Sequence, residues 1–62
     1  MATDKKILFA ADLEEMTGIP QSTWRYWAHT GQGPRSYHLG RRRVWDLEDY
    51  EFWRAEQRAA GQ

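Results

Sequence analysis

Five arginines occupy the middle third of the chain, and no acidic residue lies among them. They are Arg25, Arg35, Arg41, Arg42 and Arg43, within a segment from 20 to 45 that contains neither aspartate nor glutamate. A guanidinium group binds phosphate through paired hydrogen bonds, so arginine suits nucleic-acid backbones. The flanking thirds carry an excess of acid, and the formal net charge of zero therefore hides a basic centre. This distribution predicts a polyanionic partner, and we expect double-stranded DNA.

The first part of this basic segment reads as a helix over about 20–30. Trp24, Trp27 and Ala28 have the i, i+3, i+4 spacing of an apolar face that anchors a helix to a core. The remaining face is polar or amphipathic and has no acid, as a helix that reads the major groove requires. An ordinary solvent-exposed face is the alternative, which the lack of acid disfavours. The candidate DNA-binding residues of this helix are Gln21, Ser22, Thr23, Arg25, Tyr26 and His29.

The second part reads as a β-hairpin whose tip carries three consecutive arginines at 41–43. Adjacent like charges repel one another, and a phosphate backbone or a narrow minor groove would relieve that repulsion. In the alternative, the charges only protect a short strand edge from aggregation. Strand alternation places the middle arginine on the opposite face from the other two. We expect at least one of the three to pair with an acid such as Asp46 or Glu48.

Hydrophobic spacing and turn residues predict the order helix, turn, helix, hairpin, helix. Gly18 suits the left-handed position that ends a first helix, and Pro20 suits the first position of a second. The sequence thus predicts one domain over 1–62, with an ordered core over about 7–58, that is mainly α with a small β-hairpin. The expected elements are an apolar entry segment over 7–9, helices over about 10–17, 20–30 and 47–59, and strands over 36–39 and 43–46.

Packing of aromatic side chains must stabilise so short a chain, because it has no cysteine and two distant histidines. The four tryptophans, at positions 24, 27, 45 and 53, are expected in the core. Their alternative role is as stacking platforms for single-stranded nucleic acid. No metal and no cofactor are expected, because His29 and His38 lack companion ligands.

Catalysis and membrane insertion are both disfavoured. The sequence shows no motif that pairs a nucleophile with a base. A chain of 62 residues is also short for enclosing a substrate pocket of about 300 Å³. We therefore expect that the protein is not an enzyme. The longest apolar run, Ile7 to Ala11, has five residues, whereas a membrane span needs about 20 and a signal peptide about 7–15. We expect no membrane association and a cytoplasmic location.

A series of short motifs resembles the compact winged helix-turn-helix domains of the MerR-like family, and among them those of phage excisionases. The resemblance covers roughly residues 7–54. One departure is Phe9, which stands where the family usually has a capping Thr or Ser. The motifs are Asp12-Leu13, Thr17-Gly18-Ile19-Pro20, Thr23-Trp24-Arg25-Tyr26-Trp27 followed by Gly31, Leu39-Gly40-Arg41-Arg42, and Asp49-Tyr50-Glu51 with Trp53.

The resemblance implies a winged helix-turn-helix fold whose second helix enters the major groove. Arg25 and Tyr26 would clamp the backbone, while Gln21, Ser22 and Thr23 would approach the bases. The hairpin would be the wing, with Arg35, Arg41, Arg42 and Arg43 on the minor groove or the phosphates.

The resemblance also implies a function in a bacterial host cell. An excisionase binds tandem sites side by side, self-associates head to tail on DNA, bends it and directs a phage integrase toward excision. A small transcriptional regulator of the same family is the alternative within DNA binding. No small-molecule effector is expected, because the chain ends soon after Trp53, where larger members add an effector domain. From another class, the acidic third helix would instead dock a basic protein.

Overall fold

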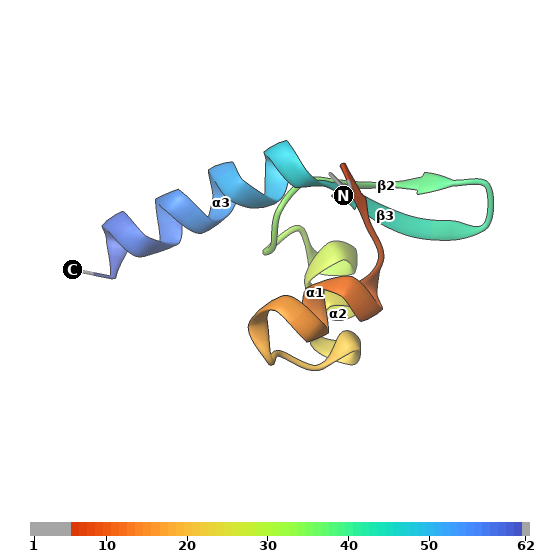
Figure 1. The fold of residues 1–62 in the computed structure, drawn as a ribbon, viewed down its shortest axis with the longest axis horizontal. Helices are drawn as coiled ribbons and strands as arrows, with labels where there is room; N and C mark the ends of the chain where they lie inside the picture. Colours follow the sequence, from red (N-terminus) through yellow and green to blue (C-terminus); the bar gives the residue numbers. More distant parts are fainter. Residues whose placement is uncertain (1–5, 62) are drawn as a thin grey trace, which may run out of the picture.

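A computed structural model describes residues 6–61 and places three helices around one antiparallel sheet (Figure 1). The strand order in the sheet is β1-β3-β2, so β3 is central. Together these elements make a small α+β domain. In chain order they are β1 (Ile7–Leu8), α1 (Ala10–Thr17), α2 (Gln21–Thr30), β2 (Ser36–Leu39), β3 (Arg42–Asp46) and α3 (Leu47–Ala60).

The third strand, β1, corrects the prediction of a two-stranded hairpin. Ile7 pairs with Asp46 and Leu8 with Trp45, antiparallel to β3. Beyond them the Leu47 N–H donates to the Lys6 carbonyl at 2.8 Å. A strand of two residues is too short for an alternating pattern to reveal. Its pairing with β3 and the burial of Leu8 against the core place it in the sheet. The entry segment is thus part of the sheet.

The bounds of α1 agree with the prediction, and its start shows how a helix begins without a capping hydroxyl. Phe9 is the N-cap residue, and its side chain accepts no hydrogen bond. Asp12 reaches back instead, and its Oδ2 accepts the Phe9 N–H at 2.8 Å. This is one half of a capping box. At the other end Gly18 adopts a φ of 81° and its N–H donates to the Glu14 carbonyl, as expected for a glycine after a helix.

The bounds of α2, β3 and α3 differ slightly from those predicted. Pro20 is the N-cap of α2 rather than its first residue, because its ψ of 149° is extended. Its carbonyl accepts the N–H groups of Thr23 and Trp24. Arg42 belongs to β3 rather than to the turn, and α3 runs to Ala60.

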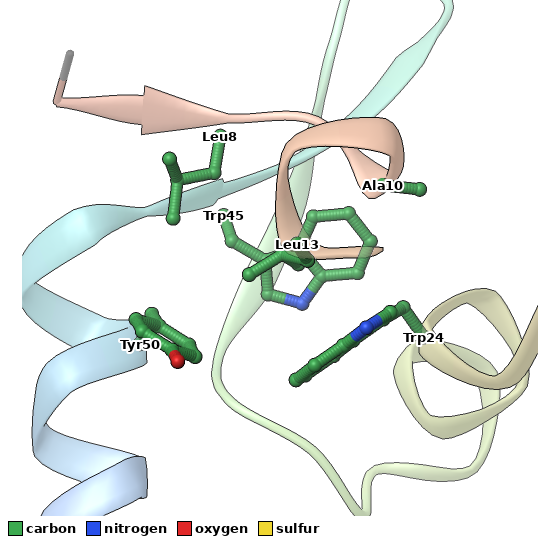
Figure 2. Close-up of a cluster of buried hydrophobic side chains, with 6 residues drawn as sticks. All are labelled: Leu8, Ala10, Leu13, Trp24, Trp45 and Tyr50. Atoms are coloured by element: carbon green, nitrogen blue, oxygen red, sulfur yellow. The ribbon is translucent and has the colours of Figure 1, made fainter. Parts of the chain in front are cut away.

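The core is a cluster of buried aliphatic and aromatic side chains, which Figure 2 shows. Trp24 is fully buried and makes edge-on contacts with four rings, whose centroids lie 5.2 to 6.4 Å away. Trp45 is also fully buried, whereas Trp27 and Trp53 are half-buried against the cluster. Burial of Trp24 and Trp45 removes those two rings from any stacking platform. The four rings around Trp24 are those of Trp27, Trp45, Tyr50 and Trp53.

The hairpin and α3 extend to opposite sides of the α1–α2 pair (Figure 1). Because β1 pairs only with the last two residues of β3, the far half of the hairpin continues as two strands alone. Within residues 6–61, no helix is both long and apolar enough to cross a bilayer.

Candidate nucleic-acid interface

The starts of α1 and α2 meet the hairpin around a surface depression of about 270 Å³. Four of its lining residues are arginines, and none is acidic. They come from two segments that are 16 residues or more apart in sequence, so folding concentrates the positive charge in one concavity. The lining residues are Ala10, Ala11, Gln21, Arg25, His38, Arg41, Arg42 and Arg43.

The contribution of α2 is its first turn. Gln21 and Arg25 are four residues apart and therefore share a face. The Arg25 Nη2 donates to the Gln21 Oε1 at 2.9 Å. This bond aligns the two side chains along the rim, and the exposed Arg25 keeps further N–H donors for an anion.

The contribution of the hairpin comes from the end nearest its turn. His38 pairs with Arg43 in the strand register, and both line the depression. The Arg43 Nη1 donates to the Ser36 hydroxyl oxygen at 3.1 Å. The guanidinium carbon of Arg42 lies 4.5 Å from the centroid of the Phe9 ring, a cation–π contact. Packing and one neutral hydrogen bond thus hold these arginines, and their charges remain available to a ligand.

The expected pairing of a hairpin arginine with Asp46 or Glu48 is not what the described residues show. Asp46 Oδ1 instead accepts the Tyr37 hydroxyl at 2.8 Å. This hydrogen bond, together with desolvation and the charges of Asp46 and Asp49, raises the pKa of Tyr37 above its ordinary value. Asp46, at the end of β3, therefore links β3 to Tyr37 of β2.

The structure separates the other sequence-predicted residues from this depression. Ser22, Tyr26 and His29 are exposed along α2, and Thr23 is half-buried. Arg35 precedes β2 and lines a different depression that also contains Asp49 and Glu56. Acidic neighbours make Arg35 the weakest of the predicted phosphate contacts.

Sequence reasoning missed His38, which lines the depression, and Phe9, which contacts Arg42. The signal for His38 was present, because alternation in a hairpin with a two-residue turn sets it opposite Arg43. No sequence signal places Phe9 under Arg42, since that contact depends on how β1 leads into α1.

The arrangement offers cationic and amide groups for binding an anion. Among residues 6–61, no group of three or more His, Cys, Asp or Glu side chains lies close enough to hold a metal ion. Comparisons with protein families, curated proteins and solved structures give no match to the chain. The chemistry of the depression is therefore the basis for a functional proposal.

Proposed function

We propose that this chain is a double-stranded DNA-binding protein with a winged helix-turn-helix architecture. The observation that carries the proposal is the acid-free depression in which Arg25 of α2 joins the three arginines of the hairpin. In this proposal α1 and α2 are the helix-turn-helix, and the β2–β3 hairpin is the wing. Four arginines that line one depression would supply cationic contacts to the phosphates of a duplex backbone.

The exposed face of α2 supplies the contacts that would read sequence. A major groove about 12 Å wide admits one helix, and residues near the helix start reach the base edges. Gln21 and Ser22 lie there, while the exposed Tyr26 stands one turn further along. The wing arginines would then follow the phosphates or enter the adjacent minor groove.

Salt dependence of binding to a random-sequence duplex tests this proposal. Each neutralised phosphate contributes about −0.9 to the slope of log affinity against log salt. The four arginines of the depression then predict a slope of about −3.6, measurable by fluorescence anisotropy. Arg41→Ala should make the slope less negative by about 0.9.

Arg54→Ala is the matched control, because Arg54 is an exposed arginine on α3 that lies outside the depression. The slope of this variant should equal that of the unsubstituted protein. Absence of DNA binding, or binding without salt dependence, would overturn the proposal. Equal changes in the salt slope for Arg41→Ala and Arg54→Ala would mean that the phosphate contacts are not made by the depression.

Within DNA binding we propose the role of an excisionase, which rests on the motif resemblance. The protein would bind tandem sites, bend the DNA and direct a phage integrase, its second partner. The hairpin and α3 extend to opposite sides of the molecule (Figure 1), so a basic wing can approach a neighbour's acidic α3 head to tail. The acids of that helix are Glu48, Asp49, Glu51 and Glu56.

A second candidate function is protein docking through α3, and the exposure of that helix favours it. Residues 54–61 are all exposed, and Phe52 presents 68% of its surface to solvent. A basic partner protein would suit the acids around Phe52. Capture of such a partner by a protein that fails to bind DNA would favour this function over the first.

A further inference from the structure

An apolar side chain stands at the end of the basic hairpin. Leu39 is the last residue of β2, faces Arg42 across the register and leaves 51% of its surface exposed. The two-residue turn Gly40-Arg41 follows it directly. This end of the hairpin lies beyond the part of β3 that β1 covers, and it extends away from the helices (Figure 1).

Single exposed leucines are common on protein surfaces, so exposure alone says little. The position of Leu39 is what distinguishes it. Hairpin tips are usually polar, and charged residues normally protect their edges. Here the charge is entirely arginine, with no acid between residues 20 and 45, and one leucine projects among it.

We propose that Leu39 is a wedge that enters between two base pairs of a duplex held by the wing arginines. The inference rests on the proposed DNA binding and adds a mechanism by which the protein kinks its target. The interior of a base stack is apolar and its edge is lined by phosphates. Leucine is among the side chains that minor-groove proteins insert to unstack a step and bend the helix.

The geometry of the turn supports this role. Gly40 has a φ of 67° and nothing lies within 4 Å of the position that a Cβ would take, so the space beside this turn residue is open. Leu39 and Arg42, being directly opposite in the register, project to the same face of the strand pair. The leucine would therefore enter the stack from the strand face that also carries Arg42, whose guanidinium packs over Phe9.

An anionic membrane also combines surface phosphates with an apolar interior. The wing offers it only one leucine, however, and stable membrane attachment needs much more buried apolar area. The arginines also line a depression of about 270 Å³, which has room for a single phosphate group of a backbone. The observations thus favour DNA, and vesicles of phosphatidylserine provide the contrasting arm of the test.

The test compares Leu39→Ala with Leu39→Met and with Met16→Ala, a control on α1 whose side chain is 49% exposed. Ligase-mediated ring closure of fragments of about 100 bp measures bending, because such fragments are shorter than the persistence length of about 150 bp. The unsubstituted protein and the Met16→Ala variant should accelerate ring closure. Leu39→Met should retain that activity, because methionine keeps a similar apolar volume.

Leu39→Ala should bind the same fragments with an unchanged salt slope and should no longer accelerate ring closure. Ring closure that is equally fast with Leu39→Ala would overturn the wedge and leave DNA binding intact. An unsubstituted protein that binds DNA without bending it would do the same. Failure to bind DNA at all would overturn the proposed function as well. Vesicle binding that depends on Leu39, without DNA bending, would replace the duplex with a membrane as the ligand.

Discussion

Truncation of Trp24 should nearly abolish folding, because one side chain joins most of the core. It is fully buried and contacts four aromatic rings that come from α2, β3 and α3. Replacing a buried tryptophan by alanine costs about 3–5 kcal/mol. At about 0.05–0.15 kcal/mol per residue, a chain of 62 residues has a total stability of about 3–9 kcal/mol. The substitution therefore removes between about a third and all of the free energy of unfolding.

The indole nitrogen of Trp24 affects the expected cost of a second substitution, Trp24→Phe. Its Nε1 is buried and has no hydrogen-bond partner among the described residues, which is also true of Trp45 and Trp53. An unpaired buried donor costs about 1–3 kcal/mol. Trp24→Phe removes that donor together with the pyrrole ring, so its net cost should be only about 1–2 kcal/mol.

Urea unfolding followed by far-ultraviolet circular dichroism measures both variants. Phe52→Ala is the control, because an exposed position usually changes stability by less than about 0.5 kcal/mol. We expect the loss of unfolding free energy to be smallest for Phe52→Ala, larger for Trp24→Phe and largest for Trp24→Ala. The Trp24→Ala variant should show no folded baseline. A Trp24→Ala variant whose unfolding midpoint equals that of the unsubstituted protein would refute the central role of this side chain.

Two further predictions concern the sheet and the assembly on DNA. The hydrogen bond to Asp46 raises the folded-state pKa of Tyr37, so its stabilising contribution is complete below the unfolded pKa of about 10 and disappears as pH rises through the folded value. Tyr37→Phe should therefore weaken the loss of stability seen in urea titrations between pH 9 and 12, and an identical pH dependence in both proteins would contradict the coupling. The protein should sediment as a monomer without DNA and bind two correctly spaced sites more tightly per site than one. A tight dimer in free solution, or equal affinity per site, would exclude the head-to-tail arrangement.

The sequence by itself was sufficient for the helices, since their signals are local. The bounds of α1 agree with the prediction, and β2 agrees likewise. Glycines at 18 and 31 adopt the positive φ that ends a helix, and only the neighbouring residues are needed to predict this. The separation of the basic middle third from its acidic flanks was also evident from the sequence, because it depends only on the positions of charged residues along the chain.

Only the tertiary structure decided how those elements combine. The two-residue β1 exists because β3 offers it a partner edge some 37 residues away along the chain, and no periodicity encodes such a pairing. The basic depression also depends on tertiary structure. The start of α2 and the hairpin place Arg25 near Arg43, whereas Arg35 lies beside Asp49 and Glu56. The periodicity of a helix or strand determines on which face of that element a side chain lies. Contacts between residues far apart in the sequence determine which faces of different elements pack together.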